Sequence, residues 1–173
     1  MSPDRTPEEN KAIMADYIEH FWNQNDAQAS ARFVAEDVVL HGIDADVPTP
    51  LPPGRQGLIE MRHMFDTAMP DFKMTIDHMI AEDDMVLLHW TGAGTHTGDF
   101  FGVPATHRSA TWTAMSLTRM EDGKMKEGWQ TMDNMGLMQQ LGVLPKGSPP
   151  APMRLFLSLK GKRQAKKNRK AAG

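Results

Sequence analysis

The chain has 173 residues with 40% hydrophobic content and no cysteine, which excludes disulfides, thiolate nucleophiles and cysteine-based metal sites. It contains no apolar run of 18 residues and begins with a polar, acidic segment, so we expect a cytoplasmic protein without a membrane-spanning helix or signal peptide. The formal net charge of −3 is uneven, because eight of the 19 Lys and Arg residues follow residue 153 and all 22 acidic residues precede it. We therefore predict one folded domain over residues 1–145, a Pro- and Gly-rich linker over 146–152 and a basic tail over 153–173.

The N-terminal segment carries three signals for a helix that begins after Thr6. Thr6 is a good N-cap, Pro7 suits the first helical position, and Glu9 completes a capping box. The helix is predicted to run to about residue 23, with Tyr17 and Phe21 on its buried stripe. Two interpretations of Tyr17 stay open: its hydroxyl faces a binding site, or it is a core aromatic with the hydroxyl at the rim.

A short helix capped by Asp26 and a first strand over residues 37–41 follow. His41 ends that strand, where a lone histidine is more often structural than catalytic. After a proline-rich loop, residues 58–69 have helical spacing and stop before a proline. His63 lies off the centre of the apolar stripe of that helix, which predicts a surface or rim position.

Four more strands are predicted in the second half of the chain. Residues 72–77 alternate apolar and polar side chains, and residues 85–91 form a more continuous apolar run. Gly92 and Gly94 then weaken the strand, so we expect a bulge or a curled sheet there. The last two strands are joined by the turn Asp122-Gly123, because Asp-Gly supplies the backbone angles of a tight hairpin.

Counting outward from that turn gives a register. It predicts that Ser116 faces Trp129 and that Trp112 faces Asp133. One sheet face then carries the alternating residues of both strands: Trp112, Ala114, Ser116, Trp129, Thr131 and Asp133. A guessed pairing across the long glycine-rich loop adds Trp90 to the same face.

Asp133 thereby becomes a candidate general acid or base, since desolvation on an aromatic face favours the protonated form of a carboxyl group. Asp133 or Asn134 also fits the N-cap of a short final helix. Spacing alone leaves both interpretations open.

Helices at the front of the chain and strands at the back indicate an α+β fold, with a curved antiparallel sheet wrapped over the helices. The sequence lacks a Gly-x-Ser-x-Gly motif, a phosphate loop and a dinucleotide fingerprint. The seven histidines show no short metal-binding pair, so we expect neither a metal nor a cofactor.

The basic tail combines an apolar block, residues 155–159, with clustered Lys and Arg. We expect this block to pack on the folded domain or on a dimer partner, with the residues beyond it solvated. Weak contact with an anionic membrane is the alternative, and no nucleic acid partner is expected.

Several stretches together resemble the SnoaL-like polyketide cyclase family. They are Gly94–Pro104 (GTHTGDFFGVP), Asp122–Met125, Glu127–Trp129 with Asp133 beyond it, and Gln139–Gly142. The resemblance covers roughly residues 8 to 144. The family commonly continues the first stretch with Gly-x-Pro-Pro-Thr-Gly, whereas this chain has GVPATH.

The resemblance implies a cone-shaped barrel of the nuclear transport factor 2 kind, often dimeric through its sheet, with a deep apolar pocket between sheet and helices. It also implies an acid/base residue on the last strand for an intramolecular aldol ring closure without metal or cofactor, and the matching position is Asp133. Tyr17 and His63 are the nearest counterparts of the polar residues that family pockets take from their helices.

We therefore predict a cofactor-independent acid/base enzyme of the cyclase type, with lyase or isomerase chemistry on a small, largely apolar or aromatic carbonyl compound. Alternatives are a dehydratase, hydratase or hydrolase in the same barrel, or a binding module without catalysis. The predicted catalytic residue is Asp133. The predicted substrate-binding residues are Tyr17, Phe21, His41, His63, Trp90, Trp112 and Trp129, and we expect a homodimer.

Overall fold

The computed structural model describes residues 5–42 and 51–147. The chain divides into two compact units, residues 1–143 and 144–173. All helices and strands of the described residues belong to the first unit. The predicted basic tail and most of the predicted linker lie outside the described residues, as does part of the proline-rich loop.

Helix α1 spans Pro7–Tyr17 and begins as the sequence predicts. Thr6 and Glu9 form the capping box: the Thr6 backbone nitrogen donates to Glu9 Oε2 over 2.8 Å, and the Glu9 nitrogen donates to Thr6 Oγ1 over 3.3 Å. The chain then continues as a π-helical segment, η1, over Ile18–Asn23. A π-helical turn uses i→i+5 hydrogen bonds and is wider than an α-helical turn, which changes the side chains that share a face.

Asp26 caps the next segment, as predicted, through its Oδ1 atom. The 3₁₀ turn η2 (Ala27–Ala29) and the short helix α2 (Ser30–Phe33) follow, and strand β1 spans Val34–His41. Helix α3 covers Arg55–Ala68 and ends before Pro70.

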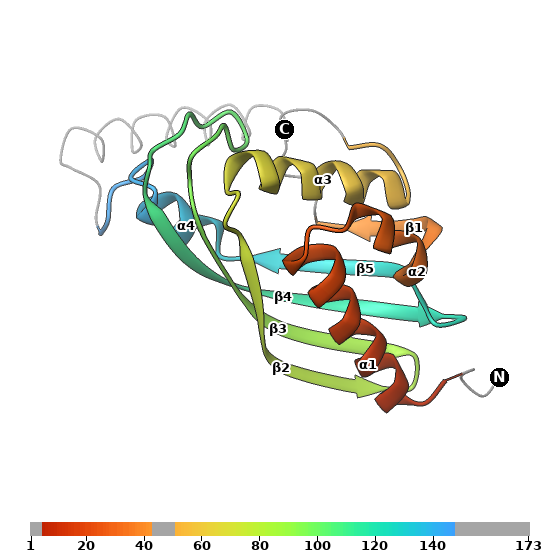
Figure 1. The fold of residues 1–173 in the computed structure, drawn as a ribbon. Coiled ribbons are helices and arrows are strands. Elements are labelled where there is room, and N and C mark those ends of the chain that lie inside the picture. Colours follow the sequence, from red (N-terminus) through yellow and green to blue (C-terminus); the bar gives the residue numbers. More distant parts are fainter. Residues whose placement is uncertain (1–4, 43–50, 148–173) are drawn as a thin grey trace, which may run out of the picture. The chain divides into compact units, whose positions relative to one another are not determined.

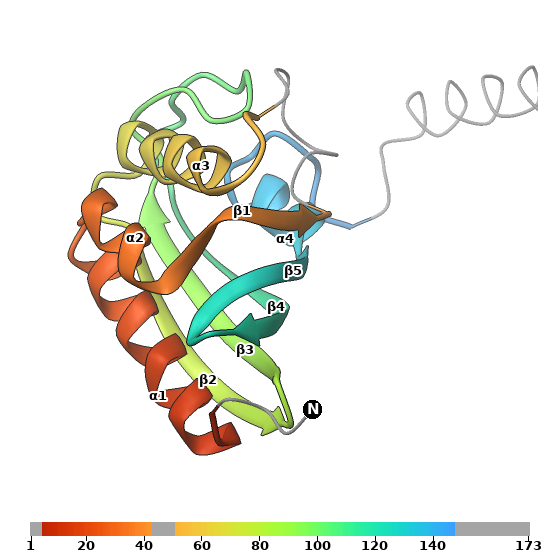
Figure 2. The same cartoon turned by 90° about the vertical axis from the view of Figure 1, so that its right-hand side faces the viewer.

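The sheet contains five strands in the order β1-β5-β4-β3-β2. The remaining strands are β2 (Lys73–Glu82), β3 (Met85–Thr95), β4 (Ser109–Glu121) and β5 (Lys124–Met132). Strand β1 pairs with β5 in parallel, and the other neighbours are antiparallel. Figures 1 and 2 show a strongly curved sheet with α1 and α3 on its concave side. The predicted α+β fold with a curved sheet over helices is thus confirmed.

The last hairpin differs from the predicted register by one residue. The turn itself is as expected, since Glu121 pairs with Lys124, but the register shifts between Arg119 and Met120. Arg119 pairs with Glu127, so the β5 strand carries an extra residue there, as in a β-bulge. Every side chain of β5 beyond this point therefore points to the opposite face from the one predicted.

The predicted pairings of Ser116 with Trp129 and of Trp112 with Asp133 are both wrong for this reason, since Asp133 comes level with Thr113. Ser116 faces Gln130 and Leu117 faces Trp129. Trp129 and Thr131 consequently belong to the outer, convex face of the sheet, while Gln130 joins Ser116 on the concave face. The guessed pairing of Trp90 with Ala114 is correct.

The pairing of β3 with β4 runs without a shift from Met85 to Thr95, so there is no bulge between these strands at Gly92. Of the two predicted alternatives, the sheet curves there instead. Gly92 lies opposite Trp112, and a Cβ atom at Gly92 would come within 2.7 Å of the indole ring. The missing side chain gives the Trp112 ring its place in the core.

The core lies between the concave face and the helices, and it is rich in aromatic rings. Both Trp22 and Trp112 contact the rings of Phe65 and Phe72, and the ring centroids of these four pairs lie 5.7 to 6.4 Å apart. Such contacts between large rings stabilise a fold beyond simple burial.

The convex face carries an apolar row that crosses four strands. Ile80 pairs with Leu87, Leu87 with Leu117, and Leu117 with Trp129. Ile80, Leu117 and Trp129 are 64%, 37% and 36% exposed, and Leu87 is half-buried. We call these four residues the outer apolar row.

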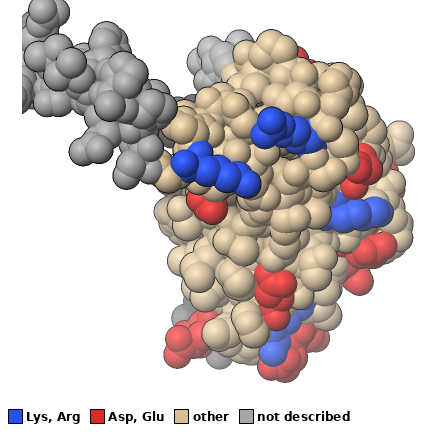
Figure 3. Space-filling view, turned by 90° about the vertical axis from the view of Figure 1, so that its left-hand side faces the viewer, with Lys and Arg blue, Asp and Glu red and all other residues tan. Residues whose placement is uncertain are grey.

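Charged side chains are scattered on the side of the molecule that Figure 3 shows, where Lys and Arg do not gather in one patch. Among the described residues, no helix is both long and apolar enough to cross a membrane.

Candidate functional site

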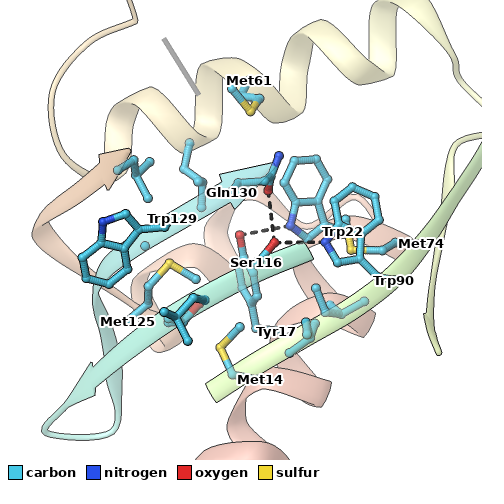
Figure 4. Close-up of a pocket in the computed structure, with 17 residues that line it drawn as sticks. Met14, Tyr17, Trp22, Met61, Met74, Trp90, Ser116, Met125, Trp129 and Gln130 are labelled. Atoms are coloured by element: carbon cyan, nitrogen blue, oxygen red, sulfur yellow. Dashed lines mark hydrogen bonds between the residues drawn. The ribbon is translucent and has the colours of Figure 1, made fainter. Parts of the chain in front are cut away.

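A cavity opens between α1, η1, α3 and the concave face of the sheet (Figure 4). It offers about 50 Å³ to the centres of water-sized spheres. One water needs roughly 10–15 Å³ by that measure, so the space suits several waters or, after side-chain adjustment, a small organic ligand. We call it the Ser116 cavity. Its lining comprises Met14, Tyr17, Ile18, Trp22, Leu40, Leu58, Met61, Met74, Leu88, Trp90, Ser116, Leu117, Thr118, Met125, Gly128, Trp129 and Gln130.

Four methionines in this lining make the cavity adaptable. Met14, Met61, Met74 and Met125 come from two helices and two strands. Methionine has an unbranched side chain with several rotatable bonds, so such a wall can adjust to the shape of an apolar guest.

A directed chain of hydrogen bonds crosses one wall of the cavity. Trp90 Nε1 donates to Ser116 Oγ over 3.0 Å, and Ser116 Oγ lies 3.3 Å from Gln130 Oε1. An indole N–H can only donate, so Ser116 receives from Trp90 and gives its own proton to Gln130. Figure 4 shows the three side chains meeting at Ser116.

A second polar pair comes from the helical side. Trp22 Nε1 donates to the Tyr17 hydroxyl oxygen over 3.0 Å, and both side chains are buried. Burial raises the pKa of the Tyr17 phenol, and the Trp22 hydrogen bond opposes that shift only in part. Tyr17 therefore stays protonated at neutral pH, and its O–H group remains a hydrogen-bond donor.

The lining provides hydrogen bonds but almost no charge. Tyr17 is the only residue with an ionisable side chain among the described residues that line the cavity. The described residues also contain no group of three or more His, Cys, Asp or Glu side chains that could hold a metal ion. The arrangement suits an apolar compound with one or two oxygen acceptors.

A second cavity adjoins the first. It offers about 120 Å³ to the centres of water-sized spheres and is lined by Gly42, Met61, Phe65, Phe101, Gln130, Thr131, Met132 and Asn134. We call it the Phe101 cavity. Met61 and Gln130 line both cavities.

Asp133, the predicted acid/base residue, lies outside the lining of the Ser116 cavity. Its side chain is exposed and caps helix α4 (Asn134–Gln140), with Oδ1 accepting from the Gly136 nitrogen over 2.8 Å. A Cβ atom at Gly136 would collide with this carboxylate, so the cap depends on the glycine. The capping interpretation is thus observed, and a catalytic role of Asp133 stays a prediction.

The other predicted binding residues fall into two groups. Tyr17 and Trp90 line the Ser116 cavity, and Trp129 lies at its edge, where it is 36% exposed. By strand alternation the Trp129 side chain belongs to the convex face, where its ring stacks on His41 with centroids 5.1 Å apart.

Four predicted binding residues do not line this cavity, and their role in binding stays a prediction. Phe21 is fully buried behind it, stacked on Tyr17, while Trp112 packs over Gly92. His41 is exposed at the end of β1, and its Nε2 atom lies 2.9 Å from Glu127 Oε1. His63 is exposed on the outer side of α3.

Sequence reasoning missed Gln130, Trp22 and Met61. Gly128 could have indicated that Gln130 faces the cavity, because a glycine inside a strand often marks a bulge, and a bulge changes the face on which the following side chains lie. Trp22 falls off an α-helical stripe and is brought to the cavity by the π-helical segment. Met61 lies within the helical pattern of residues 58–69, and only the packing of α3 makes it a cavity residue.

Fold and site together define an α+β protein of the nuclear transport factor 2-like class, with an apolar cavity between helices and sheet. A family model described as SnoaL-like polyketide cyclase matches residues 12–141. The chain therefore belongs to the SnoaL-like polyketide cyclase family. No curated protein matches the chain.

Solved structures agree with this family. IdmH from Streptomyces antibioticus, provisionally assigned as a polyketide cyclase, is 29% identical with a TM-score of 0.66, over 77% of this chain and 98% of that one. AclR from Streptomyces galilaeus, provisionally assigned as a hydroxylase, is 25% identical with a TM-score of 0.69, over 94% of this chain and 98% of that one. TsrD from Streptomyces laurentii shares the fold, at 22% identity and a TM-score of 0.72, over 82% of this chain and 100% of that one.

Proposed function

We propose that this protein is a cofactor-independent enzyme of the polyketide cyclase type, which binds a small, largely apolar carbonyl compound in the Ser116 cavity and closes a ring in it. Membership of the SnoaL-like polyketide cyclase family supports the reaction class. The apolar, methionine-rich lining supports the class of ligand.

One observation carries the proposal: neutral hydrogen-bond donors lie in an apolar cavity. Tyr17 keeps its proton, and the Gln130 amide points its oxygen at Ser116 and so has its nitrogen available. Donors fixed in advance around a carbonyl oxygen stabilise the negative charge that develops there, and they act strongly where water is excluded.

The proposed ring closure needs no oxidant or reductant. A proton leaves the carbon next to one carbonyl group, and that carbon forms a bond with a second carbonyl carbon of the same molecule. The second carbonyl oxygen takes up a proton and becomes a hydroxyl group, so the mass does not change.

Asp133 remains the proposed acid/base residue. Its chain neighbours Met132 and Asn134 line the Phe101 cavity, which brings the backbone at Asp133 near that space. To act on a substrate there, the carboxylate has to leave its cap on the Gly136 nitrogen.

A linear diketone in heavy water tests the proposal. Diacetylpropane should exchange its α-protons and close its ring faster with the protein than in buffer, as followed by proton NMR. Combining Tyr17→Phe with Gln130→Met should remove most of the acceleration. Rates equal to those in buffer would contradict an enzyme of this type.

A binding module without turnover is the second candidate. The observation that favours it is the lack of carboxylate and imidazole groups among the described lining residues, together with the engagement of Asp133 in a helix cap. Such a module would change its tryptophan fluorescence with an aromatic ketone and form no product.

We also propose that the protein forms a homodimer through the outer apolar row. The family resemblance and the exposed apolar side chains at the centre of the convex face support this. A two-fold contact between copies would bury them together.

A further inference from the structure

Gln130 occupies a special position because its side chain borders both cavities. On one side lies the apolar Ser116 cavity, and on the other lies the Phe101 cavity, whose lining includes the polar residue Asn134. Met61 is the only other residue shared by the two linings among the described residues. A ligand that occupied both spaces would lie beside Gln130 and Met61.

The hydrogen-bond chain fixes which end of the Gln130 amide is available. Trp90 Nε1 donates to Ser116 Oγ, and the Ser116 hydroxyl donates to Gln130 Oε1. The Gln130 Nε2 atom then points away from Ser116. No hydrogen-bond partner of this nitrogen is found among the described residues, although each amide NH₂ group has two protons to donate.

We propose that Gln130 determines which ligands this protein accepts, by donating from Nε2 to an oxygen at the junction of the two cavities. The inferred ligand has an apolar ring in the Ser116 cavity, a carbonyl oxygen at Gln130 and a second polar group in the Phe101 cavity. Trp90 and Ser116 are positioning residues that hold the amide in this orientation. The inference rests on the proposed use of the cavity as a binding site and adds the chemical class of the ligand.

Fluorine NMR titration of two matched probes tests the carbonyl contact. The probes are para-fluoroacetophenone and para-fluoroethylbenzene, which have nearly the same shape and differ in the carbonyl oxygen. The unmodified protein should bind the ketone roughly three- to tenfold more tightly, the range that one net hydrogen bond supplies. Gln130→Met keeps the length of the side chain without its donors and should abolish this preference.

Gln56→Met is the matched control. Gln56 lies on the exposed side of α3, where its Nε2 donates to Glu60, and it lines neither cavity. The same chemical change at this position should leave the preference for the ketone unaltered.

Ser116→Ala tests the positioning role. Gln130 is still present, but nothing fixes the orientation of its amide, so the preference for the ketone should fall below that of the unmodified protein. Gln130→Glu, which offers a carboxylate acceptor in place of the donor, should reduce binding of the ketone alone.

The α-hydroxy derivative of para-fluoroacetophenone tests the second polar group and should bind more tightly than the parent ketone. Weaker binding would overturn the two-cavity ligand. Equal binding of ketone and ethyl probe by the unmodified protein would overturn the role of Gln130, while the binding site would stand. If none of the probes binds, both the inference and the proposed function of the Ser116 cavity are wrong.

Discussion

Tyr17 and Trp22 are five residues apart, and the Trp22 indole nitrogen donates a 3.0 Å hydrogen bond to the Tyr17 hydroxyl oxygen. An α-helix would turn side chains at this spacing well away from each other. The π-helical segment between them, with hydrogen bonds between residues five apart, brings both to one side. The irregular turn therefore builds the helical wall of the Ser116 cavity.

Tyr17 should resist ionisation until the protein unfolds. It is the only tyrosine in the chain, so the ultraviolet absorbance of tyrosinate reports this residue alone. Burial raises its pKa above the ordinary value of about 10, so the folded state holds the proton more tightly than the unfolded state. The free energy of unfolding should thus fall as pH rises above about 10. Tyr17→Phe should weaken this fall, and a folded protein with an ordinary tyrosine titration would contradict the burial.

Asp133 has a structural and a proposed chemical role, and two substitutions separate them. Asp133→Ala removes the cap of α4 and should lower the free energy of unfolding by about 1 kcal/mol. Asp133→Asn keeps a capping oxygen and should leave the melting temperature nearly unchanged. If the carboxylate is the acid/base group, Asp133→Asn should slow turnover about 10²- to 10⁴-fold. Asp26→Asn, a cap outside both cavities, is the control.

Gly92→Ala should destabilise the protein by about 1–3 kcal/mol, because the new methyl group would press on the Trp112 ring in a packed core. Thermal unfolding followed by circular dichroism measures the change. Gly128→Ala is the matched control in the neighbouring part of the sheet, where the nearest atom to the new Cβ is the Leu40 Cδ2 atom at 3.4 Å. Equal melting temperatures of the two variants would contradict the packing at Trp112.

Arg62 holds α3 against the end of the first helical segment. Its Nε donates to the Phe21 carbonyl oxygen over 3.1 Å, it forms an ion pair with Asp66, and its side chain is only 4% exposed. Burial lowers the pKa of the guanidinium, and Asp66 opposes this. Asp66→Asn would leave the buried cation unpaired and should cost about 3 kcal/mol in urea unfolding.

An exposed ion pair serves as the comparison for Arg62. Arg119 pairs with Glu121 and Glu127 at the surface, with 33% of its side chain exposed. Glu121→Gln should leave the free energy of unfolding nearly unchanged, because water screens an exposed pair. If Asp66→Asn lowered the free energy of unfolding as little as Glu121→Gln, the charge of Arg62 would be well solvated.

The outer apolar row predicts a change of oligomeric state. Leu117→Lys places a charge in the middle of the row and should convert the proposed homodimer into a folded monomer, as measured by analytical ultracentrifugation. Met135→Lys is the control, since Met135 is 66% exposed on α4 and lies outside the row. A monomeric unmodified protein would exclude the proposed dimer.

The sequence by itself determined the elements whose causes are local. The capping box at Thr6, the turn at Asp122 and the stop before Pro70 depend on residues within a few positions of each other, and all three are confirmed. The α+β class follows from the order of these elements, and the family follows from short motifs spread along the chain. Such features do not require knowledge of distant contacts.

Only the tertiary structure decided which side chains enter the cavity. One extra residue in β5 reverses the faces of Trp129 and Gln130, and one π-helical turn brings Trp22 beside Tyr17. Both irregularities are stabilised by packing across the sheet and against α3, which a pattern with period 2 or 3.6 does not contain. Because side chains alternate at every residue, a shift of a single position exchanges the wall of a cavity with the outer surface.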